Sequence, residues 1–279
     1  MSWFKMLARN KLALIGLIIV ILLVLSAIFA PLLAPHSPSE QRLEQALLLP
    51  SMEFPFGTDD LGRCIFSRII FGARLSLLIG ITVTAICAVT GVFIGMLAGF
   101  YGGIVDEVIM RLVDIFLAFP GLILALIIAG LMGPGMFNVM FALALVGWMG
   151  YARVVRGTVL AEKQKEFVET ARALGATDLY LMYRHLLPNV MAPIIVMASV
   201  GIGHTILAAA GLSFLGVGVQ PPTPVWGLML KDGKGFLQTA PHLTIFPGLA
   251  IMVTVLAFNF LGDGLRDLLD PRLKEKRIE

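Results

Sequence analysis

The chain has 279 residues, of which 58% are hydrophobic and only 14% are charged, and its mean hydropathy is +0.92. A water-soluble domain carries about a quarter charged residues, so this chain has too few charges to cover a globular surface. Its net charge of +3 is not gathered in a basic patch with interleaved aromatic residues, which argues against nucleic acid as a partner. Composition therefore predicts an all-α protein embedded in a lipid bilayer.

The first element is an apolar run at 12–34 that follows a few basic residues. A secretory signal has an apolar core of about 7–15 residues. This run exceeds that length and can cross a hydrocarbon layer of about 30 Å. We expect it to be retained as the first membrane span.

The next segment, TDDLGRCIFSRIIFGARLSLL at 58–78, has the pattern of an amphipathic helix that Thr58 or Asp59 could cap. One face would hold Leu61, Ile65, Phe66, Ile69, Ile70 and Ala73, and the other would hold Arg63, Ser67, Arg68 and Arg74. Such a helix is expected to lie in the outer leaflet. Residues 1–74 would then form a span, an external loop and an interfacial helix, and residues 75–279 the transmembrane core.

Further runs of spanning length lie at about 75–100, 112–132, 136–152, 190–212 and 243–262, which gives six transmembrane helices in total. Pro120, Pro193 and Pro247 fall in or near spans, where proline kinks a helix or marks an unwound turn. Six spans place both termini on the same side of the membrane.

Glycines in the second span predict how it packs. Gly91, Gly95 and Gly99 recur at every fourth residue. Such a spacing leaves one helix face without side chains, so a second helix can approach closely. Tight helix packing is favoured here over a ligand site.

The distribution of Lys and Arg indicates the orientation. If the termini are cytoplasmic, 15 of the 21 basic residues lie inside and 6 lie outside. The six outside would be Arg42, Arg63, Arg68, Arg74, Lys231 and Lys234. Basic residues favour the cytoplasmic side, so we predict a multi-pass protein with both termini in the cytoplasm.

Several kinds of chemistry lack their sequence signature. No GxxxxGK[ST] stretch is present to hold ATP phosphates. The histidines, at 36, 185, 204 and 242, show no HxxxH or HExxH spacing, so no metal site is expected. An intramembrane serine protease needs a glycine after its serine, but Phe214 follows Ser213 in GLSFLG. No catalytic residue is therefore predicted.

The predicted spans also lack the ionisable residues that a proton- or ion-driven transporter carries at mid-membrane depth. His204, in the fifth span, is the one deep titratable side chain. A transporter without an internal coupling group needs an outside source of energy.

A polar stretch, EFVETARALGATDLYLMYRHLLPN at 166–189, separates the fourth and fifth spans. Phe167, Thr170, Ala171 and Leu174 share one face of its first helix, and charged residues occupy the other sides. We expect Gly175 to end this helix in a left-handed conformation, Asp178 to begin a second helix, and Pro188 to bend or restart it towards span five. The alternatives are a solvated loop and a rigid knob that a partner grips.

At this point a family resemblance can be stated. Glu169-Thr170-Ala171, Gly175 and Leu187-Pro188 resemble the EAA motif of membrane subunits in binding-protein-dependent ABC importers. The motif usually has Ala at the position of Thr170 and Ile at the position of His185. The whole chain is similar to the second permease subunit of dipeptide, oligopeptide and nickel importers, which carries stretches like those at 56–77, 211–230 and 257–271. Cys64 stands where that subgroup has an acid.

The resemblance implies a type I ABC importer permease fold with a cytoplasmic coupling helix at about 163–188. It also implies a heterodimer with a second homologous permease, two ATPase subunits or domains, and an extracytoplasmic solute-binding protein, in a bacterial or archaeal cytoplasmic membrane. ATP and Mg would then bind to the partner ATPases, with no cofactor on this chain, and the chain itself would not be an enzyme.

The solute stays open between a short peptide and a nickel or other metal complex. The stretch GIGHTIL at 201–207 is similar to nickel-type permeases, which makes His204 a candidate pathway residue, although a lone histidine on an apolar helix face is more often a packed core residue. The alternative function is a secondary transporter or channel that works without an ATPase. That function predicts mid-membrane carboxylates or an inverted repeat, and the sequence has neither.

Overall fold

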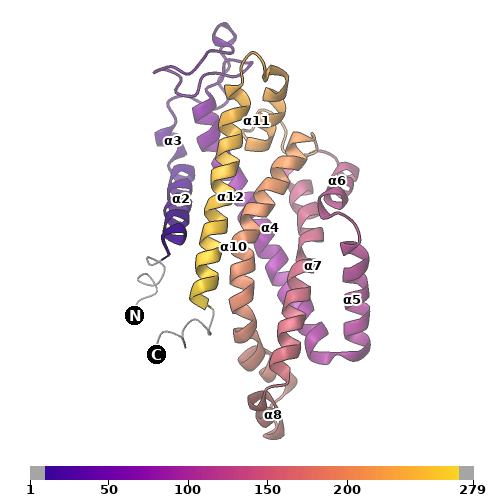
Figure 1. Ribbon diagram of the computed structural model, residues 1–279. Coiled ribbons are helices and arrows are strands. Elements are labelled where there is room, and N and C mark those ends of the chain that lie inside the picture. The colour runs from indigo at the N-terminus through magenta and orange to yellow at the C-terminus, as the bar shows by residue number, and fades with distance from the viewer. Residues whose placement is uncertain (1–9, 270–279) are drawn as a thin grey trace.

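The structure is a computed structural model that describes residues 10–269, and it confirms the predicted all-α fold (Figure 1). The long helices are α2 (Lys11–Ile28), α4 (Ile65–Tyr101), α7 (Met136–Lys163), α10 (Leu187–Phe214) and α12 (His242–Leu269). Shorter helices are α3 (Ala30–Leu33), α5 (Gly103–Leu117), α6 (Gly121–Met132), α8 (Glu166–Ala173), α9 (Asp178–Tyr180) and α11 (Trp226–Gly233). The single turns are η1 (Leu43–Gln45), η2 (Leu181–Leu186) and η3 (Lys234–Phe236). The long helices form a bundle, and we name its two ends the α11 end and the α8 end after the helices that lie there.

Within the described residues, five helices are long and apolar enough to cross a membrane. A sixth crossing exists only if α5 and α6 together form one span, and they are bent by 86° at the break between them. Pro120 lies at this break, as predicted, and is the N-cap residue of α6. A proline disfavours the helical conformation of the residue before it, which explains why the predicted span at 112–132 is broken at Pro120.

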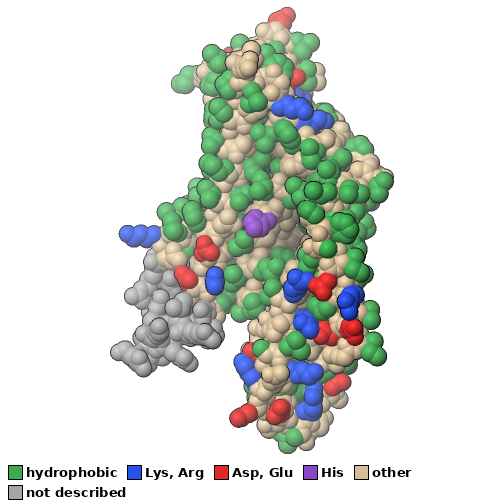
Figure 2. Space-filling model, turned by 45° about the vertical axis from the view of Figure 1, so that its right-hand side comes forward, with side chains coloured by type: hydrophobic (Ala, Val, Ile, Leu, Met, Phe, Trp, Pro, Cys, Tyr) green, Lys and Arg blue, Asp and Glu red, His purple; other side chains and the backbone are tan. Residues whose placement is uncertain are grey.

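The bundle is longer than a bilayer is thick. Helix α4 has 37 residues, so it is about 55 Å long at 1.5 Å per residue, compared with a hydrocarbon layer of about 30 Å. Figure 2 shows hydrophobic side chains over the middle of one face and charged side chains towards its ends. The ends of the bundle therefore extend beyond the apolar layer.

The glycine face of α4 packs directly on α7, as predicted. A Cβ atom on Gly91 would lie 2.3 Å from Cβ of Tyr151, and one on Gly95 would lie 2.4 Å from the carbonyl oxygen of Ala152. A Cβ on Gly99 would lie 2.8 Å from Cβ of Val159. The two backbones therefore touch over three turns, and any side chain at these glycines would push the helices apart.

The prediction of a separate interfacial helix before span two is wrong. Residues from Ile65 onward belong to α4 itself, which continues without a break to Tyr101, so the expected boundary after residue 74 falls inside a helix. Three of the four polar residues that were expected to meet water are buried, since Arg63 is 3% exposed, Arg68 is 1% exposed and Ser67 is fully buried, whereas Arg74 is exposed. Thr58 and Asp59 do not cap the helix, whose N-cap residue is Cys64.

Asp59 explains why two arginines can be buried at the α11 end. One of its carboxylate oxygens accepts hydrogen bonds from the backbone N–H groups of Leu61 and Arg63, at 3.0 and 2.9 Å. The other accepts from Nε of Arg63 at 2.7 Å and lies 3.5 Å from Nε of Arg68. Asp232 of α11 lies 3.9 Å from Nη2 of Arg63. A buried charge needs a partner, and Asp59 supplies it within four residues of Arg63.

We predict that Asp59→Asn lowers the free energy of unfolding strongly, by about 3–5 kcal/mol, because it leaves Arg63 and Arg68 buried without their counter-charge. Thermal unfolding of the purified protein in detergent would measure the loss.

Asp232→Asn is the matched control. Burial raises the pKa of the Asp232 carboxyl above its usual range, against the opposing effect of Arg63. A raised pKa means that the contribution of this group is present at low pH and is lost as the pH rises, so at neutral pH its neutral replacement should cost little. Equal destabilisation by the two variants would contradict the role assigned to Asp59.

Candidate functional site

The polar stretch predicted to be a knob lies at the α8 end, beyond the long helices (Figure 1). Helix α8 begins after Lys165 and contains one buried residue, Val168, which belongs to the main hydrophobic cluster together with Leu181 and Leu186 of η2. Glu169 and Thr170 are exposed and Ala171 is half-buried. The helix is thus attached to the bundle through one side and leaves its other sides free.

Gly175 ends α8 as predicted, with φ of +86°. Its N–H donates to the carbonyl of Arg172 at 3.0 Å, and the N–H of Ala176 donates to the carbonyl of Ala171 at 3.1 Å. This pair of bonds is the Schellman motif, in which a left-handed residue closes the last helical turn. A Cβ atom on Gly175 would have no neighbour within 4 Å, so no clash within this chain excludes a side chain there. The left-handed backbone conformation alone favours glycine at this position.

After this turn the chain enters a second helix, as expected. Asp178 is the first residue of α9, and the side chain of Thr177 accepts a hydrogen bond from the N–H of Tyr180. A π-helical turn, η2, then leads into α10, where Pro188 lies in the first turn. Pro188 is exposed and Leu187 is half-buried. The last two motif residues therefore lie at the base of α10, apart from the four on α8 and its turn.

Thr170 and His185, the two residues that differ from the usual motif, each make a contact within this region. Thr170 Oγ1 donates to the carbonyl of Glu166 at 2.8 Å, so the extra hydroxyl is satisfied inside the helix. The ring of His185 lies 5.9 Å from Phe167 and 5.6 Å from Tyr180, between α8 and α9. Sequence reasoning missed this contact, because only the fold brings these three aromatic rings together.

The free surface of this region is apolar as well as polar. Leu174 is 84% exposed, and Leu179 and Tyr183 are each 72% exposed. A hollow of about 450 Å³ lies at the α8 turn, lined by Ala171, Leu174, Gly175, Ala176, Thr177, Tyr180 and His185. Leu179 and Tyr183 line a separate hollow against α4. Large apolar side chains exposed next to a rigid turn are typical of a protein–protein contact.

Ion pairs and cation–π contacts fix the α8 end. Asp106 of α5 holds Arg156 of α7 through two bonds of 2.5 and 2.6 Å. Lys163 donates to the carbonyl of Phe100 at 2.5 Å, and Arg172 of α8 lies 5.8 Å from the Phe100 ring. The region that carries the motif is therefore connected to α4, α5 and α7.

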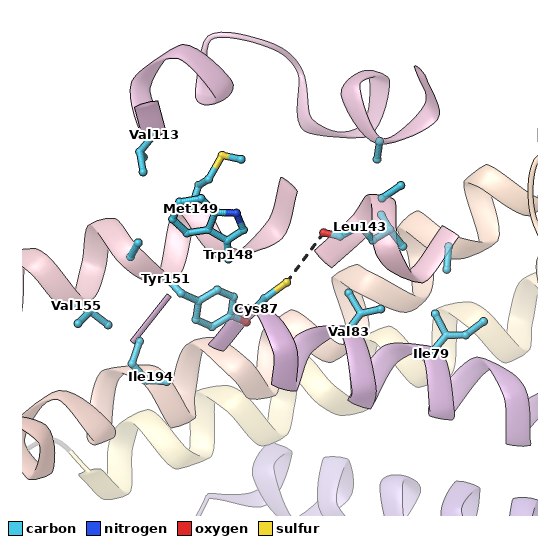
Figure 3. Packing of buried hydrophobic residues seen from close by; sticks show 14 of the residues in the cluster. Ile79, Val83, Cys87, Val113, Leu143, Trp148, Met149, Tyr151, Val155 and Ile194 are labelled. Carbon is cyan, nitrogen blue, oxygen red and sulfur yellow. Dashed lines mark hydrogen bonds between the residues drawn. The ribbon is translucent and has the colours of Figure 1, made fainter. Parts of the chain in front are cut away.

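His204, the other predicted site residue, lies in the middle of α10 and lines a cavity of about 580 Å³. Helices α4, α6, α7 and α10 form the walls, and no Asp, Glu, Lys or Arg is among the lining residues. Figure 3 shows the adjoining core, where Cys87 of α4 lies beside Tyr151 of α7. The EAA-like motif and this cavity are thus separate features, and α10 carries residues of both.

Comparison with known proteins decides the family. Residues 91–275 match the profile of the family described as binding-protein-dependent transport system inner membrane component. The chain belongs to this family. Residues 2–50 of the permease also match the N-terminal transmembrane domain of oligopeptide transport permease C.

Curated relatives of the permease cover almost its whole length. It is 47% identical to a dipeptide transport system permease protein of Alkalihalophilus pseudofirmus, over 97% of this chain and 89% of that protein. It is 46% identical to a di/tripeptide transport system permease protein of Pseudomonas aeruginosa, over 98% and 92%. It is 45% identical to a glutathione transport system permease protein of Pectobacterium atrosepticum, over 98% and 91%. The chain is therefore a permease subunit of an ABC importer.

We predict that Gly175→Val abolishes uptake while the permease still inserts and folds. The substitution strains a left-handed residue by about 1–2 kcal/mol and places a branched side chain on the surface of the α8 turn. Solute uptake and the amount of inserted protein, both measured in membranes, would test this.

Gly133→Val is the matched control, because Gly133 has φ of +87° and also has no neighbour within 4 Å of a built Cβ atom, but lies between α6 and α7. Because ψ at Gly133 is 172°, a conformation essentially restricted to glycine, a valine there is strained at least as much as at Gly175. Equal loss of uptake in both variants would show that strain, and not the location of Gly175, causes the defect.

Proposed function

We propose that this permease forms half of the translocation pathway for a short peptide, and that its α8 turn couples the pathway to a separate ATPase. The observation that carries the proposal is the exposed turn of α8, which Gly175 closes and which presents Leu174 with 84% of its surface exposed. This rigid turn projects from the bundle, as a segment must if it is to be held by another subunit.

The charges at the two ends support an α8 end in the cytoplasm. Exposed or half-exposed basic residues gather there on α7, α8 and η2: Arg153, Arg156, Lys163, Lys165, Arg172 and Arg184. At the opposite end, Arg63 and Arg68 are buried against Asp59. Basic residues favour the cytoplasmic side. The terminal residues Lys5, Arg9, Arg272, Lys274, Lys276 and Arg277, which also support cytoplasmic termini, lie outside the described residues.

We infer the partners from the family of the chain and their sides of the membrane from this orientation. The assembly would contain this chain, a second homologous permease, two ATPase subunits or domains that bind ATP and Mg, and a solute-binding protein at the α11 end. ATP binding would close the ATPases, displace the α8 turns and open the permease cavity outward, and hydrolysis would return it to the inward-facing state.

A peptide is favoured over nickel as the solute. The relatives are named for dipeptides, di- and tripeptides and glutathione, all of which contain peptide bonds. Between residues 10 and 269, no group of three His, Cys, Asp or Glu side chains is placed to hold a metal ion. His204 therefore lines the cavity without the additional ligands that a bare metal ion would require.

A secondary transporter is the other function considered from the sequence. It would need a titratable group to bind its coupling ion. Of the residues that line the cavity, His204 is the only one with a basic or acidic side chain, and no second observation favours this function.

We predict that proteoliposomes with this chain, the second permease, the ATPases and the binding protein accumulate dialanine only when ATP is present. Glu169→Lys should abolish this uptake and release the ATPase, because it reverses an exposed charge on α8 beside the turn. Co-purification of the ATPase would report its release.

Glu107→Lys makes the same change on α5, where the side chain is 71% exposed and forms an exposed pair with Arg111 that contributes little. Uptake by this control should stay near the wild-type rate. ATP-dependent uptake by the Glu169→Lys complex with its ATPase still bound would refute the coupling role of α8.

The orientation gives a separate prediction. Alkaline phosphatase should be active when it is fused after Lys234, in η3 at the α11 end, and inactive when it is fused after Lys163, at the end of α7. The enzyme folds only outside the cytoplasm, so its activity in whole cells reports the side. The reverse pattern would refute cytoplasmic termini.

A further inference from the structure

The wall of the cavity that His204 lines has no charged side chain, but it is not uniformly apolar. Its polar side chains are Thr84, Cys87, Tyr151, His204 and Thr205. They come from α4, α7 and α10, which pack against one another. Since the backbone N–H and C=O groups inside these helices are bonded to each other, the side chains supply the hydrogen-bonding groups of this wall.

Two of the five polar side chains already contact backbone carbonyl groups of the protein. The hydroxyl of Tyr151 donates to the carbonyl of Met197 at 3.4 Å. The thiol of Cys87 lies 4.0 Å from the carbonyl oxygen of Leu143 and 3.7 Å from that of Ala144 (Figure 3). These two groups are therefore already engaged.

The other three side chains keep hydrogen-bonding capacity. Thr84 Oγ1 and Thr205 Oγ1 lie 3.1 Å apart, and either can be the donor. Each hydroxyl has one proton and two lone pairs, so the pair leaves one donor and further acceptor sites after its own bond is made. His204, next to Thr205 on α10, is exposed to the cavity and has no hydrogen-bond partner within residues 10–269.

Glycines keep these groups at the cavity wall. A Cβ atom on Gly201 would lie 2.4 Å from the Tyr151 hydroxyl and 3.3 Å from Cγ2 of Thr84. A Cβ on Gly147 would lie 2.6 Å from Sγ of Cys87. The absent side chains allow α4 and α7 to approach closely, and α10 to approach both. The threonine pair can form only because α4 and α10 are this close.

We propose that Thr84, Thr205 and His204 form a hydrogen-bonding strip for the uncharged amide groups of a peptide in transit. The wall has no fixed charge to pair with the peptide termini, whereas an amide that enters the cavity exchanges its water for the donor and acceptor groups of this strip. The three residues would determine which solutes pass, in addition to the selection made by the binding protein. This inference rests on the proposed import of short peptides.

The test uses the complete complex in proteoliposomes, with dialanine as the probe. Thr84→Val with Thr205→Val removes both hydroxyls and keeps the side-chain shape. Uptake of dialanine should fall about fivefold or more, as expected for the loss of one or two hydrogen bonds. ATP hydrolysis stimulated by the loaded binding protein should persist, because the α8 turn is unchanged.

Two further variants make the test specific. Thr254→Val removes a buried hydroxyl whose bond, 2.7 Å to the carbonyl of Ala250, lies within α12 and away from the cavity. Uptake by this control should match the wild type. His204→Gln, which keeps a donor and an acceptor, should retain most uptake, whereas His204→Leu should lose it.

Wild-type uptake by the double threonine variant would overturn the proposal. So would a joint loss of uptake and stimulated ATP hydrolysis, since that pattern marks a defect in coupling or folding, and so would an equal loss in Thr254→Val. A wild-type complex that hydrolyses ATP but accumulates no dialanine would instead reject the import of peptides itself.

Discussion

The contact between α4 and α7 is the constraint on which the rest of the structure depends. Gly91, Gly95 and Gly99 let the two backbones touch, so the position and tilt of one helix fix those of the other. Lipid gives no hydrophobic driving force for helix association, and close packing of small residues replaces it. Because α10 packs on both helices, the positions of the cavity wall and of Leu187 and Pro188 at the base of α10 both depend on this contact.

The sequence alone predicted the features that depend on the conformational preference of a single residue. The glycine spacing in α4, the break at Pro120 and the left-handed turn at Gly175 each depend on the conformational limits of one residue type. The length of an apolar run similarly identified the long helices. Such features need no knowledge of which segments meet in the fold.

Sequence reasoning failed where a polar residue has a partner inside the protein. The arginines before α4 follow a helical period, and that period looks the same whether the polar face meets water or a buried carboxylate. In this protein Arg63 and Arg68 meet the buried carboxylate of Asp59 rather than water. Neither the hydrogen bonds of Asp59 to the backbone nor the approach of Asp232 can be predicted from the spacing of residues in the sequence. His185 is a similar case, since its position between Phe167 and Tyr180 depends on the turn at Gly175 that brings α8 and α9 together.

The path from α9 through η2 into α10 has a mechanical consequence. From Asp178 to Phe214 the chain is one continuous helical rod, with the turn of α8 at one end and His204 and Thr205 farther along it. At 1.5 Å per residue, Asp178 and His204 are about 39 Å apart, so a tilt of about 5° at one of them displaces the other by about 3 Å. If this rod moves as one body, a small push on its outer end therefore shifts His204 and Thr205 by about the size of a side chain, enough to widen or narrow the cavity that they line.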